Sequence, residues 1–140
     1  MTARQVKRWG IPCIVFDGTS LRICDFNKDV IEELILALIQ LVPIGNVTTY
    51  SSIARLLNIH PRTVALVLKR NKNPVVYPCH RVVRSDGYVG GYTLLGKRVA
   101  GVKEKLLTLE GISIINRHIP PHKIVDLTKS LLIPETGRKD

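Results

Sequence analysis

The chain has few cysteines and aromatic residues, and it has no long hydrophobic run. Its three cysteines are Cys13, Cys24 and Cys79, and they form no Cys-x-x-Cys pair, so the sequence offers no zinc-binding module. No stretch reaches the roughly 18 to 20 apolar residues of a membrane span. Residues 1–5 lack the apolar core of a signal peptide. We therefore expect a cytoplasmic protein that uses no metal or other cofactor.

Acidic residues are also scarce. The 140 residues include 11 Asp and Glu against 21 Lys and Arg, which gives a formal net charge of +10 at pH 7. Such an excess favours binding to a polyanion such as nucleic acid, because basic groups that neutralise phosphates release counterions. A basic protein without such a partner is the alternative. With 45% hydrophobic residues, the chain is able to bury the core of one main globular body.

The first 26 residues predict a β-hairpin after a short basic lead. β-Branched and aromatic residues gather in residues 11–16 and 21–26, on either side of a two-residue turn at Gly18-Thr19. This register places Cys13 opposite Cys24. The two cysteines then either form a disulfide or stay as two buried free thiols.

A helix should follow the hairpin, with Asn27 or Asp29 as its cap. Its apolar stripe has helical spacing and ends before Pro43; it consists of Ile31, Leu34, Ile35, Leu38 and Ile39. These residues predict an amphipathic helix with one buried face.

Residues 47–70 predict two short helices joined by a tight turn. Thr48 or Thr49 caps the first helix, and Asn58 to Pro61 end it. The inward positions are Ile53, Leu56 and Leu57 in the first helix, and Val64, Val67 and Leu68 in the second, which runs from Pro61 to about Arg70. Arg62, Ala65 and Lys69 face outward. This arrangement fits a DNA-binding helix-turn-helix, and an ordinary helical hairpin is the alternative.

Cys79 and His80 form the candidate reactive pair of the remaining segment. A nearby imidazole activates a thiol because the thiolate is the nucleophile. We expect an extended backbone here, in which neighbouring side chains point apart, so the two residues need a bridging water or a turn. Further on, the pattern predicts a helix from about Lys97 to Leu109 that stops at Gly111. The tail after Gly111 should pack partly on the body.

The sequence PCHRVV at residues 78–83 resembles the acceptor motif of the O6-alkylguanine-DNA alkyltransferases. The resemblance covers about 70 residues, through VPIGNVTTY at 42–50, PRTVA at 61–65, Asn71, SDGYVGGY at 85–92 and KEKLLTLEG at 103–111. It implies a fold of the α/β (α+β) class. A mainly helical alkyltransferase domain with a helix-turn-helix would span residues 41–111, between a reduced N-terminal hairpin and helix (1–40) and a C-terminal extension (112–140).

The resemblance also implies the reaction. Cys79 would accept an alkyl group from O6-alkylguanine in double-stranded DNA, irreversibly and once per molecule, after the nucleotide is flipped out. His80 would take the thiol proton through an ordered water, and Glu110 would orient His80. Tyr50 would help to rotate the nucleotide and would bond guanine N3. The family resemblance further suggests a monomer, with cooperative binding on DNA left open.

The remaining site residues come from the same resemblance. Arg62 matches the arginine that fills the space left by the flipped nucleotide, and Ala65 matches a small residue that lets the helix approach the minor groove. The other DNA-binding positions it implies are Lys69, Thr49 and Ser51. The substrate pocket would contain Tyr92, Thr93, Asn71 and Val82, with Asn71 bracing the turn before Cys79.

The sequence departs from the family pattern after Tyr92. Residues 93–98 make the stretch before Lys103 several residues longer, and either Lys97 or Lys103 matches the family's lysine. Leu94 and Leu95 would narrow the pocket or widen it toward bulkier adducts. Three alternatives stay open: a lesion-binding relative, which Cys79 argues against; a relative that processes other DNA damage; and a helix-turn-helix regulator in which Cys79 is incidental.

Overall fold

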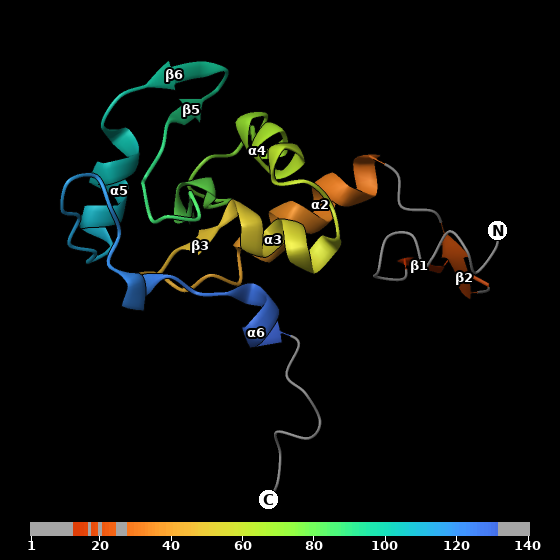
Figure 1. Ribbon diagram of the computed structural model, residues 1–140. Coiled ribbons are helices and arrows are strands. Elements are labelled where there is room, and N and C mark those ends of the chain that lie inside the picture. Colours follow the sequence, from red (N-terminus) through yellow and green to blue (C-terminus); the bar gives the residue numbers. More distant parts are fainter. Residues whose placement is uncertain (1–12, 17, 20, 25–27, 132–140) are drawn as a thin grey trace, which may run out of the picture.

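The computed structural model describes residues 13–16, 18–19, 21–24 and 28–131 (Figure 1). Strands β1 (Cys13–Phe16) and β2 (Leu21–Cys24) form an antiparallel hairpin with Cys13 opposite Cys24, which confirms the predicted register. The side chains of both cysteines lie outside the described part, as does the candidate cap Asn27. The disulfide and the two free thiols therefore both remain open predictions.

The first described helix, α2 (Lys28–Ile39), has Asp29 within its first turn. Its predicted stripe is confirmed, because Ile31, Ile35 and Ile39 are buried while Leu34 and Leu38 are partly buried against the same core. The helix ends before the turn at Pro43, as its sequence pattern requires.

Helices α3 (Tyr50–Leu57) and α4 (Pro61–Lys69) form the predicted pair with a tight turn between them. The Thr49 hydroxyl accepts a hydrogen bond from the Ser52 N–H at 3.0 Å and caps α3. Asn58 then adopts the left-handed conformation (φ 57°) that ends the helix. Pro61 starts α4, where its fixed φ suits the first helical position and its missing N–H costs nothing.

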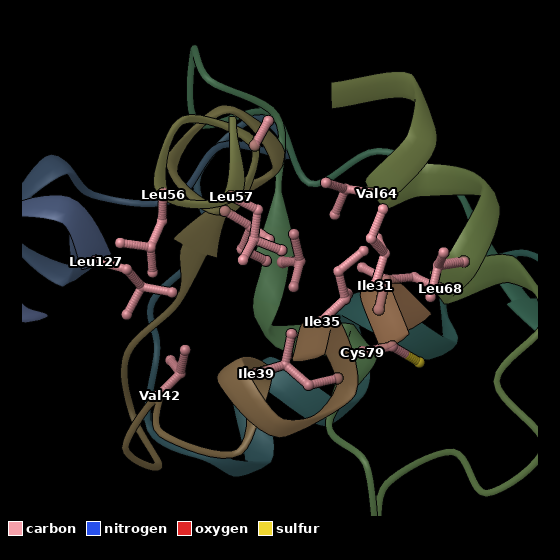
Figure 2. Packing of buried hydrophobic residues seen from close by; sticks show 14 of the residues in the cluster. Ile31, Ile35, Ile39, Val42, Leu56, Leu57, Val64, Leu68, Cys79 and Leu127 are labelled. Atoms are coloured by element: carbon pink, nitrogen blue, oxygen red, sulfur yellow. The ribbon is translucent and has the colours of Figure 1, made fainter. Parts of the chain in front are cut away.

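One hydrophobic core joins these helices (Figure 2). It contains residues from α2, α3 and α4, and Leu127 of the short helix α6 (Leu127–Leu131). The core therefore includes side chains from all three predicted chain segments, whose boundaries at residues 41 and 112 remain predictions. Cys79 lies at the edge of the labelled cluster in Figure 2.

Cys79 does not lie in an extended segment, which corrects the sequence-based expectation. Residues Cys79–Arg81 form a 3-10 turn, η1, followed by β4 (Val82–Val83). The short β3 (Thr48–Thr49), which leads into α3, pairs in parallel with β4, which follows η1. The expectation failed because His80 and Arg81 both bond to Glu110, which lies 30 and 29 positions further along the chain. These contacts hold the turn, and a local sequence pattern does not reveal them.

The predicted helix from Lys97 to Leu109 is wrong in its first part. Helix α5 spans only Val102–Leu109, because Lys97–Val99 forms β6 and pairs with β5 (Tyr92–Leu94). Leu95 and Gly96 both have positive φ (50° and 83°), which is the geometry of a two-residue hairpin turn. The extra residues after Tyr92 are thus a β-hairpin, drawn above α4 and α5 in Figure 1. The predicted stop at Gly111 (φ 92°) is confirmed.

The segment after α5 packs on the body, as predicted for part of the tail. The Val47 N–H donates to the Lys123 carbonyl at 2.9 Å, and the Val125 N–H donates to the Val47 carbonyl at 2.7 Å. Lys123 ends the short 3-10 helix η2 (Pro121–Lys123). A second small core lies nearby and contains Val47, Val83, Val89, Leu107, Ile112 and Ile119. Within the described ranges, no helix has the length and apolar character to cross a membrane.

Candidate active site and DNA-binding surface

Cys79 is one of the residues that line a small cavity. Cys79 is 5% exposed, and its Sγ is 3.5 Å from the Tyr92 hydroxyl. The cavity, the Cys79 chamber, has a volume of about 40 Å³ and is lined by Tyr50, Ala65, Leu68, Lys69, Cys79, Tyr92, Thr93 and Lys103. The structure thus brings Cys79 together with Tyr50, Tyr92 and Thr93, which the sequence placed in the site.

His80 is fully buried and bonded to Glu110. Its Nε2 is 2.8 Å from Glu110 Oε2, which brings together two residues 30 positions apart. Arg81 holds the same carboxylate with two bonds, Nε to Oε1 and Nη2 to Oε2, each 2.9 Å long. Its Nη1 donates to the Val42 carbonyl at 3.0 Å. Sequence reasoning gave Arg81 no role, although the residue stands in the PCHRVV motif.

The charges of this group fix the roles of the two histidine nitrogens. Burial raises the pKa of Glu110, but hydrogen bonds from Arg81 and His80 outweigh it and leave the pKa below its usual value. Burial lowers the pKa of His80, and Glu110 opposes this. A carboxylate only accepts, so Nε2 of a neutral His80 carries the proton. Nδ1 is then a free base, and this buried atom has no hydrogen-bond partner within the described residues.

Tyr50 and Lys103 form the other wall of the chamber. Lys103 is 1% exposed, and its Nζ lies 5.8 Å from the centre of the Tyr50 ring. Burial lowers the pKa of Lys103 to about 8 and raises that of Tyr50 to about 12, so the Tyr50 hydroxyl keeps its proton at neutral pH. Lys97, the other candidate for the family's lysine, is exposed on β6 and does not line the chamber.

Two predicted pocket residues lie behind the chamber and do not line it. Asn71 is buried, donates from Nδ2 to the Tyr77 carbonyl and accepts at Oδ1 from the Asn73 N–H, both at 2.9 Å. These bonds brace the turn between α4 and η1. Val82 is fully buried in the core, where it pairs with Thr48.

The predicted DNA-binding residues lie mainly along α4. Arg62 and Lys69 are exposed, while Ala65 is half-buried and lines the chamber. Ser51, in the first turn of α3, is half-buried. Thr49 is 8% exposed and its hydroxyl is already used to cap α3, so we assign no DNA contact to it.

A second, larger hollow begins beside the chamber and was not foreseen. Its volume is about 660 Å³, and it shares Tyr50, Ala65 and Tyr92 with the chamber. Its walls carry three arginines, Arg84, Arg98 and Arg117. No local sequence signal marks these arginines, because the three come from separate segments that only the fold brings together.

Comparison with known families now decides the membership. The model of the family described as "6-O-methylguanine DNA methyltransferase, DNA binding domain" matches residues 30–112, which include the chamber, the His80–Glu110 pair and α4. The chain belongs to this family. The match confirms the resemblance seen in the sequence.

Curated relatives agree with this membership. A methylated-DNA–protein-cysteine methyltransferase of Archaeoglobus fulgidus is 42% identical over 114 residues, which cover 79% of this chain and 74% of the relative. One of the same name from Methanothermobacter thermautotrophicus is 41% identical over 83 residues, covering 59% of this chain and 45% of the relative. The chain therefore covers less than half of the length of some relatives that it matches.

Solved structures show the same fold. The O6-methylguanine-DNA methyltransferase of Pyrococcus kodakaraensis strain KOD1 matches with a TM-score of 0.51 and 39% identity, over 58% of this chain and 46% of that chain. The S. pombe protein Atl1, solved with damaged DNA containing O6-carboxymethylguanine, matches with a TM-score of 0.60 over 71% of this chain and 98% of its own. At 22% identity, the second likeness concerns the fold alone.

Proposed function

We propose that this protein repairs DNA by moving an alkyl group from the O6 atom of guanine in a duplex to its own Cys79. The observation that carries the proposal is that the buried Cys79 lines a cavity and is followed in the chain by His80, which bonds to Glu110 and has no partner at Nδ1 within the described residues. Membership of the methyltransferase family supports the choice of substrate.

The proposed step is one in-line displacement. Cys79 Sγ attacks the alkyl carbon, the bond from that carbon to O6 breaks, and its electron pair stays on the guanine. The thiol proton passes through a water to Nδ1 of His80, and the Glu110 carboxylate stabilises the imidazolium that forms. The Tyr50 hydroxyl donates a hydrogen bond to guanine N3 and stabilises the negative charge left on the base, which a proton from water then neutralises. The thioether product is stable, and each molecule therefore reacts once.

Access to the chamber requires that the damaged nucleotide leave the helix. A stacked guanine presents O6 edge-on and out of reach of a buried thiol, and its extrusion costs a few kcal/mol. We assign Arg62, exposed at the start of α4, to the space that the nucleotide leaves. Ala65 lets the helix approach the groove closely, and Lys69 contacts phosphate. We further propose that the protein acts as a monomer in the cytoplasm.

Two other functions lead to different expectations. A lesion-binding relative would hold O6-alkylguanine without any transfer, and the likeness to the fold of Atl1 is the observation behind it. A helix-turn-helix regulator would bind one operator sequence and would not require Cys79. The Cys79 thiol in the chamber and the paired His80 that follows it in the chain argue against both, because neither function needs a nucleophile or a paired histidine.

The decisive experiment is intact-mass spectrometry after incubation with a duplex that carries one O6-methylguanine, followed by peptide mapping. We expect one mass increase that matches replacement of the thiol hydrogen by methyl, located on Cys79. An unchanged mass together with tight, lesion-specific binding would replace the proposal with the lesion-binding function.

A further inference from the structure

The larger hollow is formed mainly by parts of the chain that have no role in the proposed displacement. Its walls come from the β5–β6 hairpin, the start of α5, residues 84–91 and Arg117. It meets the Cys79 chamber at Tyr50, Ala65 and Tyr92, which line both spaces. A flipped nucleotide is larger than the chamber of about 40 Å³, so one whose alkyl group enters the chamber extends into this hollow.

The charges that line the hollow are unbalanced. Arg117 Nε donates to Glu104 Oε2 at 3.1 Å, and this is the only carboxylate among the lining residues. Arg84 and Arg98 form no ion pair with any residue in the described part of the chain. Arg84 and Arg117 also lie against the Tyr88 ring, with Cζ 5.5 Å and 5.2 Å from its centre. Two guanidinium groups thus face the hollow without a neutralising partner.

The position of Arg98 is set by its surroundings. Arg98 lies in β6 opposite Thr93, and its guanidinium lies against Gly91. A Cβ atom at position 91 would lie 2.5 Å from Nη2 and 3.0 Å from Cζ of Arg98, closer than real contacts allow. The absence of a side chain at Gly91 therefore leaves the space that the guanidinium occupies.

We propose that Arg98 and Arg84 form a phosphate-binding site for the backbone of the damaged strand while the alkyl group of its guanine occupies the Cys79 chamber. This inference rests on the proposed function. Ala65 of α4 and Arg98 of the hairpin line the same hollow, so a strand that α4 holds runs along it. Guanidinium groups bind phosphate oxygens in pairs, which suits two unpaired arginines. The chamber of about 40 Å³ is too small for a nucleotide, so the base, sugar and phosphate behind the alkyl group have room only in the hollow of about 660 Å³.

The test compares Arg98→Gln with Lys97→Gln. Both variants remove one positive charge from the same strand, but Lys97 does not line the hollow. Binding of a duplex that carries one O6-methylguanine is measured by fluorescence anisotropy over a salt series, with Cys79→Ser added to the wild type and to both variants so that no transfer occurs. We expect Arg98→Gln to weaken binding about three- to tenfold and to reduce the slope of log K against log salt by about 0.9, the value for one lost phosphate contact. Lys97→Gln should behave as the wild type, and equal behaviour of the two variants overturns the proposal.

Reaction rates distinguish a backbone phosphate from a carboxylate carried by the adduct. Arg98→Gln should slow transfer from duplexes with O6-methylguanine and O6-carboxymethylguanine by the same factor, and should leave transfer from free O6-benzylguanine unchanged. A loss confined to the carboxymethyl substrate would assign Arg98 to the adduct and overturn the phosphate site. If the wild type transfers from none of these substrates, the proposed function fails, while the salt series still tests the phosphate site.

Discussion

The two spaces that meet at Tyr92 are built in opposite ways. On the side of Cys79, the half-buried Glu110 carboxylate has its partners within the protein, because it accepts three hydrogen bonds, two from Arg81 and one from His80. On the side of the larger hollow, Arg84 and Arg98 are exposed and have no carboxylate partner within the described residues. The Glu110 carboxylate is thus neutralised within the protein, whereas Arg84 and Arg98 leave positive charge for a partner outside it.

This difference separates reaction from recognition. A buried ion pair costs desolvation and holds its geometry only when its remaining hydrogen bonds are satisfied, which the Arg81 fork provides for Glu110. Exposed guanidinium groups cost little desolvation and stay available to DNA phosphates. Changes on the chamber side should therefore affect every substrate, and changes on the hollow side should affect duplex DNA only.

The largest effect is expected for Cys79→Ser. Serine keeps the shape of the side chain, but its hydroxyl is a far weaker nucleophile than a thiolate, so methyl transfer should be lost entirely. Binding to the same duplex should stay within about twofold of the wild-type value, because Cys79 does not contribute to the exposed face of α4. Intact mass measures the first quantity and anisotropy the second. Methylation of the variant at another residue would remove Cys79 from its assigned role.

Glu110→Gln should slow transfer by about 100-fold, from the duplex and from free O6-benzylguanine alike, because the amide cannot stabilise the imidazolium of His80. Glu110 also raises the pKa of His80 against the effect of burial. Its loss lowers that pKa further, so the fall of the rate at acid pH should move to lower pH. A stopped-flow rate profile from about pH 5 to 8 covers the range in which histidine titrates.

Glu104→Gln is the matched control for this change. Glu104 also belongs to the α5 region, but it accepts its hydrogen bond from Arg117 and not from His80. Its replacement should leave the rate with free O6-benzylguanine and the acid limb of its pH profile unchanged. If Glu110→Gln reduces the rate without moving the acid limb, Glu110 supports the fold and does not act through His80.

The helical half of the site was predictable because its signals are local. The stripe of Ile53, Leu56 and Leu57 marks the buried face of α3, and Thr49 and Pro61 mark the starts of α3 and α4 within one turn. The PCHRVV motif identified Cys79, and hence one wall of the chamber, because the family's reactive cysteine lies at a fixed position in this motif. These features are visible in short windows of sequence.

The other half depends on contacts between distant residues. Lys97 to Val99 fit a helical pattern, yet pairing with Tyr92 to Leu94 makes them a strand. The 3-10 turn at Cys79 is held by Glu110, and the hollow collects arginines from three segments. No local window contains both partners of such contacts. For the same reason, the choice between Lys97 and Lys103 needed the fold, which buries Lys103 against Tyr50.

Arg62→Ala should reduce the rate of transfer from duplex DNA but not the rate of transfer from the free base. The side chain is exposed and does not line the chamber, so the rate with O6-benzylguanine should be unchanged. On the duplex, loss of the inserted side chain should reduce the rate by about tenfold, or roughly 1.4 kcal/mol of the extrusion cost. Lys129→Ala, which removes the same charge from an exposed position of α6, should leave both rates unchanged. Equal losses on both substrates would contradict the role of Arg62.

Lys103 is a buried cation on the chamber side, and its burial has a consequence for stability. Its pKa is about 8 in the folded protein against an ordinary value of 10.5. Between these values the unfolded chain binds more protons than the native state, so the free energy of unfolding should rise with pH, by up to about 1 kcal/mol per pH unit. Denaturant titrations from about pH 7.5 to 9.5 measure it, below the range in which tyrosines ionise.

Lys103→Met should abolish this rise, while Lys97→Met, at an exposed site on β6, should keep it. The comparison removes the contribution of every other group that titrates in the same interval. A wild-type free energy of unfolding that is flat or falls with pH in this range would show that the pKa of Lys103 is not lowered in the folded protein.

The smallest effect is expected for Gly91→Ala, which moves a charge without removing it. Gly91 does not have a positive φ, so alanine fits the backbone, but its Cβ would lie 2.5 Å from Nη2 of Arg98. The arginine is long and flexible and will move aside at little cost in stability. Because its guanidinium then leaves its place over the hollow, duplex binding should weaken by about two- to threefold, with no change in net charge or in transfer from the free base.

In the Arg98→Gln background the same substitution should have no further effect on binding, since the group that it displaces is absent. An additive loss in that double variant would show that Gly91 itself approaches the DNA, and would separate the glycine from the arginine in the recognition half of the site.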